Sequence, residues 1–462
     1  MRKSQKTEQA DRQQKISLED QKQAGARSIA FGEGKMMSGT QFQALVLSRD
    51  NLNLAYKRVV KNKGAAGIDG MTVEELKPYL KIHREELLAK LVNGTYKPAP
   101  VKRVSIPKPN GGTRKLGIPT VIDRLVQQAV AQVLSPMYEQ IFSDNSFGFR
   151  PRRSAHDAVQ RVIELDNAGY RYVVDLDLKA YFDTVNHDML MKFLGQRISD
   201  PWLLRLIRRF LTSGAMNGPL FERSNEGTPQ GGPISPLLAN IYLNEFDQEL
   251  TRRGHKFVRY ADDCNIFVKS PRAGQRVLAS VTAFLERKLK LTINQEKTQV
   301  VSTSRMKFLG FTLGHTRKGA YPYPVRQSKQ RIKQELKRLT KRNRGVAVEQ
   351  VCTEIRRKMR GWLQYYGFGK LKSFVAELDK WLRSRMRQYI WKQWKKIKTR
   401  ANELRGLGLT KSQAKAAANT RKGYWHTAHS QILEYTLTNE KLELRGLINL
   451  SKTLQQIQTK SA

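Results

Sequence analysis

Residues 257–270 read FVRYADDCNIFVKS, in which two adjacent carboxylates, Asp262 and Asp263, separate two apolar runs. Apolar runs on either side of a short polar break predict a β-hairpin with the acidic pair at its tip. Adjacent carboxylates repel each other and lose hydration when they are partly buried. An isolated Asp-Asp pair is most often a solvated turn, because aspartate is common in turns.

A second acidic strand end favours a functional interpretation. The stretch RYVVDLDL, residues 171–178, is apolar up to Asp175 and Asp177 and is predicted to be a strand. If this strand lies beside the hairpin, Asp177 and Asp262 meet at one edge of a sheet. Clustered carboxylates without histidine or cysteine favour Mg²⁺. A pair of such ions suits in-line phosphoryl transfer, because one activates the attacking oxygen and the other stabilises the leaving oxygen.

The charge of the chain indicates a polyanionic partner. The 462 residues include 84 Lys and Arg against 40 Asp and Glu, a net charge of +44, and nucleic acid is the usual partner of so basic a protein. No apolar run reaches the roughly 18 residues of a membrane helix, and the N-terminus lacks the apolar segment of a signal peptide. Two cysteines cannot form a disulfide framework. We expect no membrane partner and a cytoplasmic location.

Local patterns predict elements in the first third of the chain. One helix is expected to begin at an N-cap, Asp50, and to stop at Gly64. A second is expected from Thr72, whose spacing to Glu75 fits a capping box.

Strand and helix patterns continue beyond residue 100. Residues 101–120 alternate apolar and polar side chains around a Pro-Asn-Gly-Gly turn, which predicts a hairpin. A helix is expected over 121–138 and a strand over 307–314. Residues 171–320 mix strands and helices, and 322–398 contain three helical segments. Residues 326–462 carry 33 basic and 9 acidic residues, so more than half of the excess charge lies there.

Seven ordered blocks of sequence resemble the reverse transcriptases. YADD at 260–263 is similar to their signature, and the other blocks are IPKPNGGTRKLGIPTVIDRLVQQAV (106–130), NSFGFRPRRSAHDAV (145–159), DLKAYF (177–182), GTPQGGPISPLLANIYLNEFD (227–247), LTINQEKTQVV (291–301) and KFLGF (307–311). From residue 41 to about 450 the chain resembles the reverse transcriptase/maturases of bacterial group II introns. It resembles the group IIC-like members that lack an endonuclease, because no Cys/His cluster ends the chain.

The resemblance implies an α+β fold, the right-hand polymerase, with fingers and palm of antiparallel sheet plus helices. An α-helical thumb and a small basic C-terminal domain follow. The expected segments are a basic N-terminal extension (1–40), the N-terminal region and fingers (41–170), the palm (171–321), the thumb or maturase helical domain (322–398) and the C-terminal DNA-binding domain (399–462).

The resemblance also implies a catalytic set. Asp177, Asp262 and Asp263, with the carbonyl of Leu178, would hold two Mg²⁺ ions, for which Mn²⁺ is a substitute. Asp175 lies on the same face as Asp177, but Asp177 is preferred because of its spacing to the aromatic residue of DLKAYF. Lys297 would neutralise or protonate the leaving pyrophosphate.

The expected dNTP site has three parts. Lys108 and Arg114, on the arms of the predicted hairpin, would clasp the triphosphate. Phe182 would be the steric gate whose ring collides with a ribose 2′-OH. Gln230 and Gly231 would line the nucleotide pocket. In isolation each of these residues would more simply be a solvated, turn or core residue.

The expected nucleic-acid contacts are Arg150, Tyr260, Trp362, Tyr365, Arg383, Arg387, Lys392 and Lys395. Basic side chains supply salt-dependent affinity and aromatic rings stack on unpaired bases. Helix-core packing remains the favoured role for most of the thumb aromatics.

The leading functional hypothesis is an RNA-directed DNA polymerase, a nucleotidyltransferase, that binds its group II intron RNA, assists splicing and copies the intron into DNA during retrohoming. Its partners would be intron RNA, template RNA with a DNA primer, target DNA and dNTPs, in a bacterial cytoplasm near the nucleoid. One alternative is a splicing-only maturase. Another is a reverse transcriptase of a retron, diversity-generating or CRISPR-associated system. The aromatic gate disfavours an RNA-dependent RNA polymerase.

Overall fold

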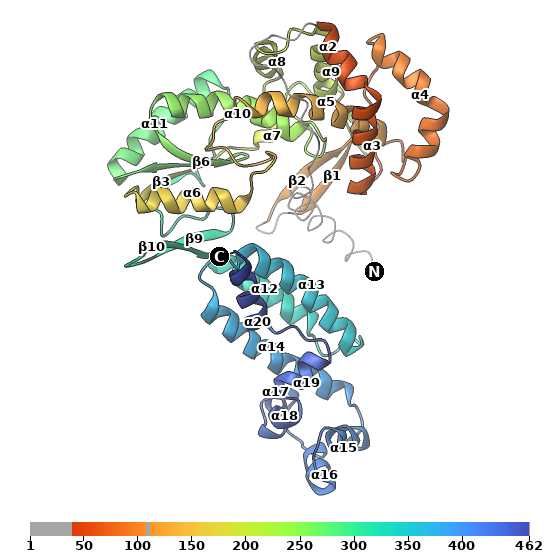
Figure 1. Cartoon of the computed structure of the whole chain (residues 1–462), viewed down its shortest axis with the longest axis vertical. Coiled ribbons are helices and arrows are strands. Elements are labelled where there is room, and N and C mark those ends of the chain that lie inside the picture. The colour runs from red at the N-terminus through yellow and green to blue at the C-terminus, as the bar shows by residue number, and fades with distance from the viewer. Residues whose placement is uncertain (1–38, 108–110, 462) are drawn as a thin grey trace. The chain divides into compact units, whose positions relative to one another are not determined.

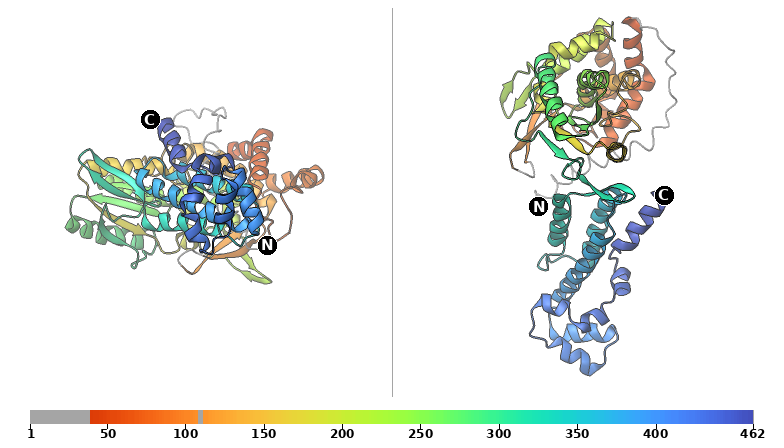
Figure 2. Two further views of the ribbon diagram at one scale, coloured as in Figure 1. Left: turned by 90° about the horizontal axis from the view of Figure 1, so that it is seen from below. Right: turned by 90° about the vertical axis from the view of Figure 1, so that its left-hand side faces the viewer.

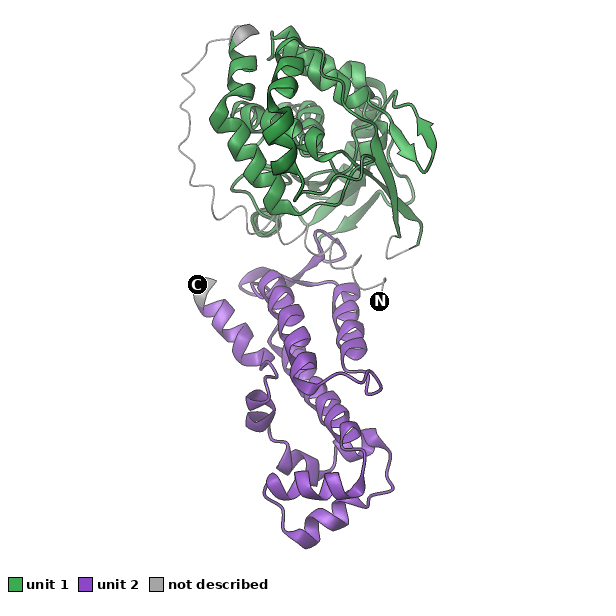
Figure 3. Cartoon of the chain, turned by 90° about the vertical axis from the view of Figure 1, so that its right-hand side faces the viewer, with its two compact units in different colours: residues 1–303 green, residues 304–462 purple. Residues whose placement is uncertain are grey.

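The computed structural model describes residues 39–107 and 111–461. The chain separates into two compact units between residues 303 and 304 (Figure 3). This boundary lies inside the segment 171–321 that the sequence predicts as palm. The boundaries of the five predicted segments stay a prediction.

The first sheet of the first unit contains the predicted hairpin. Strands β1 (Val101–Pro107) and β2 (Thr113–Ile118) pair antiparallel, which confirms that prediction. β4 (Ala215–Asn217) runs parallel to β1 and pairs antiparallel with β5 (Leu220–Glu222). The order is β2-β1-β4-β5, so this sheet is mixed rather than purely antiparallel.

The second sheet has the order β6-β7-β3-β8, and every neighbouring pair is antiparallel; β6 and β3 are labelled in Figure 1. Its strands are β6 (Lys256–Tyr260), β7 (Asp263–Val268), β3 (Tyr172–Asp177) and β8 (Gln299–Ser302). The hairpin predicted from FVRYADDCNIFVKS is confirmed as β6–β7. β7 lies between two other strands and is buried from its second residue onward, which explains its continuous apolar run.

Helices surround these sheets (Figures 1 and 2), and most of these helices share one hydrophobic core with the second sheet. Helices α6, α10 and α11 pack against the second sheet. The helices of this unit are α2 (Gly39–Leu47), α3 (Arg49–Asn62), α4 (Leu76–Val92), α5 (Val121–Glu139), α6 (Ala155–Asn167), α7 (Tyr181–Thr184), α8 (His187–Gly195), α9 (Pro201–Thr212), α10 (Ser235–Arg252) and α11 (Pro271–Lys288). The helix predicted over 121–138 is thereby confirmed.

Two predicted helix ends near the N-terminus are wrong. α3 is capped by Ser48, whose hydroxyl accepts the amide of Asn51, while Asp50 lies within the first turn. It ends at Asn62, and the C-cap Lys63, one residue before the expected glycine, has a left-handed conformation (φ 46°). A side-chain bond at Ser48 and a backbone bond from Lys63 to Val60, rather than the positions of acid and glycine alone, fix these ends.

The helix expected from Thr72 also begins later than predicted. Both the amide and the hydroxyl of Thr72 donate to the Glu75 carboxylate, at 2.7 and 2.8 Å. These bonds close a turn ahead of α4, and Glu75 itself occupies the N-cap. The predicted side-chain pair therefore exists, but it precedes the helix instead of starting it.

The second unit combines a small hairpin with helices around its own core. β9 (Phe311–Thr316) pairs antiparallel with β10 (Gly319–Pro324), and β9 begins later than the strand predicted from residue 307. The three predicted helical segments are confirmed as α12 (Arg326–Leu339), α13 (Val348–Tyr366) and α14 (Lys372–Gln393). The shorter helices that follow are α15 (Ile397–Gly406), α16 (Lys411–Ala418), α17 (Tyr424–Ala428), α18 (Gln431–Thr436), α19 (Asn439–Leu444) and α20 (Leu450–Ser461).

A search of the described residues finds no helix with the length and apolar character needed to cross a membrane.

Candidate active site

Three carboxylates meet at one end of the second sheet. The antiparallel register of β3 and β7 places Asp177 directly opposite Asp263, and residues opposed in this way have Cβ atoms about 4.5–5.5 Å apart. Asp262 lies in the two-residue turn between β6 and β7, next to Asp263. The chain thus brings a strand end at 177 beside a turn at 262–263.

Burial and like charge disfavour ionisation of Asp262 and Asp263. Burial raises the pKa of Asp263 well above its ordinary value, and the charges of Asp175, Asp262 and Asp177 raise it further. Burial also raises the pKa of Asp262, and the charge of Asp177 adds to the shift. Arg114 and Arg259 act on Asp262 in the opposite direction. A site with this surplus of negative charge attracts cations.

The oxygen donors at this end of the sheet suit a hard divalent cation, although the carboxylates do not form a complete coordination site. Within residues 39–107 and 111–461, no group of three or more His, Cys, Asp or Glu side chains is placed to hold a metal ion. The donors at the sheet end are nevertheless all oxygen, the chemistry that Mg²⁺ prefers. Leu178 and Ile293 form an isolated β-bridge, and the hydrogen bonds of this bridge use the carbonyl of Asp177 and the amide of Lys179. It does not use the Leu178 carbonyl.

Residues 294–298 secure the end of β3. The Asp177 amide donates to Thr298 Oγ1 at 3.2 Å, and its carbonyl accepts the Asn294 amide at 2.8 Å. The exposed Lys297 places its Nζ 3.2 Å from Asp177 Oδ2. Lys297 therefore neutralises a carboxylate of the cluster, which is a different position from the predicted contact with pyrophosphate.

The turn that carries Asp262 has an unusual backbone. Ala261 adopts a positive φ of 59°, a conformation that costs a non-glycine residue on the order of 1 kcal/mol. Gly148 lies against this turn: a Cβ built there would lie 2.9 Å from the carbonyl carbon of Tyr260 and closer still to the amide nitrogen of Ala261. Only a glycine allows this approach.

Of the two predicted triphosphate-binding residues, the structure describes only Arg114. Arg114 is exposed on β2, near enough for its charge to lower the pKa of Asp262. Lys108 lies outside the described residues, so its predicted role stays a prediction.

Phe182 and the loop 227–232 lie together. Phe182 is half-buried on α7 and packs edge-to-face with Tyr181 at 5.5 Å between ring centroids. Its carbonyl accepts the amide of Thr228 at 2.7 Å. The structure thus brings the predicted gate beside the loop that carries the predicted pocket residues.

The same loop also touches β2. The Gln230 carbonyl accepts the Gly117 amide at 2.9 Å. Gly231 has φ 136°, and a Cβ there would lie 2.6 Å from the Gly117 carbonyl oxygen. Gly231 therefore permits close backbone approach to β2, whereas the predicted approach was to the substrate.

Comparisons with known proteins agree with this geometry. Residues 106–313 match the family described as Reverse transcriptase (RNA-dependent DNA polymerase), and residues 329–408 match the Group II intron, maturase-specific domain. Protein YkfC of Escherichia coli (strain K12) is 36% identical over 296 residues, which cover 55% of this chain and 78% of YkfC. Group II intron-encoded protein LtrA of Lactococcus lactis subsp. cremoris is 32% identical over 353 residues. The chain belongs to the group II intron reverse transcriptase/maturase family.

The extent of these matches differs between relatives. The alignment with LtrA covers 61% of this chain and 57% of LtrA, so the chain spans a little over half of that relative. One solved chain, from a partial Cas6-RT-Cas1--Cas2 complex, aligns over 57% of this chain and 46% of its own length at 23% identity and a TM-score of 0.35. That similarity is too distant to bear on function.

Two of the predicted nucleic-acid residues of this reverse transcriptase domain serve other contacts. Arg150 is buried, and its guanidinium binds the Glu139 carboxylate and the carbonyls of Ser143 and Ser146 at 2.6–3.2 Å. Its donors are engaged inside the protein, and its predicted contact with template stays a prediction. Tyr260 is half-buried and lies opposite Asp263 in the β6–β7 ladder.

Most of the predicted thumb residues are likewise bonded or packed within the second unit. Arg383 pairs with Asp379 at 2.9 Å, and the buried Arg387 donates to the Leu437 carbonyl at 3.1 Å. The Tyr365 hydroxyl donates to a backbone carbonyl, Trp362 packs on neighbouring rings, Lys392 lies 3.3 Å from the Tyr424 hydroxyl and Lys395 is exposed.

Sequence reasoning missed the support beneath the acidic turn. Arg259, Asp247 and Asn240 are buried there and bonded to one another. The signal was present: FVRY places an arginine inside an apolar strand, and a buried arginine requires an acid partner.

Proposed function

We propose that this protein is an RNA-directed DNA polymerase that acts by two-metal-ion nucleotidyl transfer. The observation that carries the proposal is the register of β3 and β7, which opposes Asp177 and Asp263 beside Asp262. These residues lie within a domain that matches reverse transcriptases. The raised pKa of Asp263 and Asp262 supports a site built for cations.

The chain's own residues have distinct tasks in this proposal. Asp177, Asp262, Asp263 and the Leu178 carbonyl would hold two Mg²⁺ ions, or Mn²⁺ in their place. Bound there, the ions supply activation of the primer 3′-hydroxyl and stabilisation of the leaving pyrophosphate. Arg114 holds the triphosphate through its guanidinium.

Sugar selection and charge balance complete the site. Phe182 excludes the ribose 2′-OH because its ring is fixed by Tyr181 and Phe149, at 5.5 and 6.5 Å between ring centroids. Lys297 balances the charge of Asp177, as supported by their ion pair, and would neutralise the leaving pyrophosphate.

The second unit would bind RNA. Residues 329–408 match the maturase domain, and residues 326–462 carry 33 basic against 9 acidic side chains. Contacts to group II intron RNA would assist splicing, and residues 399–462 would contact target DNA while the intron is copied during retrohoming. The proposed setting is the bacterial cytoplasm, near the nucleoid.

A carboxylate substitution with a matched control tests the polymerase. Asp263→Asn should reduce primer extension on an RNA template by at least about 1,000-fold while intron RNA affinity stays within about threefold. Glu286→Gln, an exposed carboxylate on α11, should leave extension unchanged. Full extension by the Asp263 variant would contradict the proposal. A wild-type protein that promotes splicing but extends no primer would support the splicing-only alternative.

A further inference from the structure

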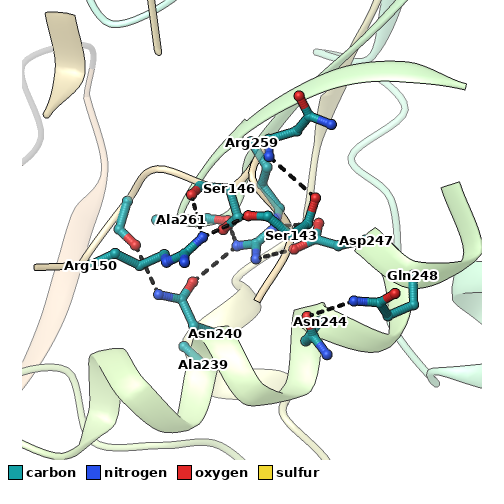
Figure 4. Close-up of polar contacts among 12 residues, drawn as sticks. Ser143, Ser146, Arg150, Ala239, Asn240, Asn244, Asp247, Gln248, Arg259 and Ala261 are labelled. Atoms are coloured by element: carbon teal, nitrogen blue, oxygen red, sulfur yellow. Dashed lines mark hydrogen bonds and ion pairs between the residues drawn. The ribbon is translucent and has the colours of Figure 1, made fainter. Parts of the chain in front are cut away.

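A buried ion pair lies directly beneath the acidic turn (Figure 4). Arg259 of β6 is 1% exposed, and Asp247 of α10 is fully buried. Arg259 Nε donates to Asp247 Oδ1 at 2.7 Å and Nη2 donates to Oδ2 at 2.5 Å. This two-point geometry fixes the plane of the guanidinium.

The same guanidinium also holds the turn. Its Nη1 donates to the carbonyl of Ala261 at 2.8 Å and to Asn240 Oδ1 at 3.0 Å. Ala261 is the residue with positive φ immediately before Asp262. The bond to its carbonyl therefore sets the peptide plane from which Asp262 continues.

A third segment is tied to the same arginine. Asn240 Nδ2 donates to the Gly148 carbonyl at 2.8 Å. The Arg259 amide donates to the Asn145 carbonyl, and its own carbonyl accepts the Phe147 amide, both at 2.8 Å. Helix α10, residues 145–148 and the acidic turn thus share one hydrogen-bonded centre.

We propose that Arg259 is a positioning residue that orients Asp262 and Asp263 toward Asp177. A buried ion pair is weak evidence for stability, because a well-packed apolar pair is often as stable. What this pair adds is geometry, since one planar group bonds three partners at fixed angles. The inference rests on the proposed polymerase function and deepens it.

Arg259→Lys is the first test, because it keeps the charge but cannot bond Asp247, Asn240 and Ala261 together. Mutation of a residue that supports a metal ligand from the outer shell typically lowers metal affinity or activity by about 10–100-fold. We expect kcat for dNTP incorporation to fall and the Mg²⁺ concentration for half-maximal rate to rise, each by about tenfold or more. The KM for primer–template should stay within twofold.

A second variant guards against simple misfolding. Asn240→Ala keeps the ion pair intact and removes only the links to Gly148 and the guanidinium, so it should shift the Mg²⁺ requirement in the same direction. Arg344→Lys, in the half-buried pair with Glu354 of the second unit, is the control and should not shift it. If both site variants match wild type in kcat and Mg²⁺ requirement, the positioning role is refuted. An inactive wild type would instead refute the proposed polymerase.

A different observation points to a binding groove on the second unit. The groove, with a volume of about 480 Å³, lies along α12, α14 and α17. Its lining is cationic, aromatic and amide in character and consists of Gln330, Lys333, Gln334, Lys337, Trp381, Arg385 and Trp425.

Two cations lie over one of the two indole rings of this groove. Lys333 Nζ lies 5.4 Å and the Arg385 guanidinium carbon 6.0 Å from the centroid of the Trp381 ring. Arg385 is anchored to the carbonyls of Lys337 and Thr340, at 3.2 and 3.0 Å. Burial lowers its pKa, and the charge of Arg342 lowers it further. Trp425 is 43% exposed.

We infer that the groove binds an unpaired nucleotide of single-stranded RNA, with the base stacked on Trp425 and the flanking phosphates on Lys333 and Lys337. Proteins bind single-stranded nucleic acid by stacking its bases on exposed aromatic rings that lie beside cationic side chains. Concentrated positive charge attracts a polyanion. This inference rests on the proposed RNA binding and gives it a location.

Fluorescence anisotropy with a labelled 12-nucleotide RNA tests the groove in the full-length protein. Trp425→Ala should weaken single-strand affinity about tenfold, with a smaller effect on a 12-base-pair RNA duplex. Lys333→Gln with Lys337→Gln should lower the salt dependence of binding by about one to two counterions. Lys288→Gln, an exposed lysine at the end of α11 in the first unit, is the control. Unchanged single-strand affinity, or equal losses for both RNAs, would refute stacking here. RNA binding that fails in the wild type would refute the proposed function itself.

Discussion

The replacement Gly148→Ala examines the acidic turn with a single methyl group. The new Cβ would lie 2.9 Å from the Tyr260 carbonyl carbon and closer to the Ala261 amide nitrogen. Both are backbone atoms and cannot rotate away. Since carbon atoms pack at about 3.5–4.0 Å, the turn must move by roughly 1 Å to accept the methyl.

A displacement of this size has a large expected effect on catalysis. A misplacement of about 1 Å can cost about 100-fold in rate, and overpacking a buried site costs about 1–3 kcal/mol of folding free energy. We expect primer extension to fall about 100-fold under conditions where the protein remains folded. Affinity for RNA should change little, because the groove and the basic helices lie in the other unit.

Gly195→Ala is the matched control. It lies at the end of α8, and no atom lies within 4 Å of its built Cβ, so stability should be unchanged or rise by up to about 1 kcal/mol. Single-nucleotide incorporation, measured beside a thermal unfolding curve, separates catalysis from folding. A Gly148 variant with extension within twofold of wild type would show that the turn is not held as described.

Three further predictions concern charge and selectivity. The raised pKa of Asp263 means that the folded chain keeps a proton which the unfolded chain releases, so stability falls as pH rises from about 4 through the raised pKa. Without divalent ions, Asp263→Asn should therefore melt higher than wild type at pH 8, a difference that disappears below about pH 4; equal melting points at pH 8 would contradict the shift. Phe182→Ala should raise rNTP incorporation relative to dNTP in single-turnover assays, and unchanged sugar selectivity would assign the gate elsewhere. The affinity for intron RNA should fall steeply with salt, and a flat response between 50 and 200 mM would contradict an electrostatic interface.

Much of the fold could be predicted from local pattern. The apolar runs on either side of Asp262 and Asp263 predict the hairpin β6–β7. Three amphipathic stretches predict α12, α13 and α14. Helix ends were less predictable, because Ser48 and Lys63 act through side-chain and backbone bonds that spacing does not reveal. The short parallel pairing of β4 with β1 depends on tertiary contact and has no local signal.

The candidate site was predictable only as a set of residue types. The motifs placed Asp177 and the 262–263 pair on strand ends, but their register follows from the packing of β3 between β7 and β8. The burial of Arg150 could not be read from GFRP alone. It depends on Glu139, which approaches Arg150 only in three dimensions.

The pairing of Arg259 with Asp247 has a consequence for how such proteins diverge. Substitution of only one partner would leave an unpaired charge in the interior, which destabilises the fold far more than substitution of both partners. We therefore expect positions 247 and 259 to change together among descendants of this sequence, while exposed neighbours drift one at a time. An engineered library that randomises both positions should return functional clones mainly as matched pairs.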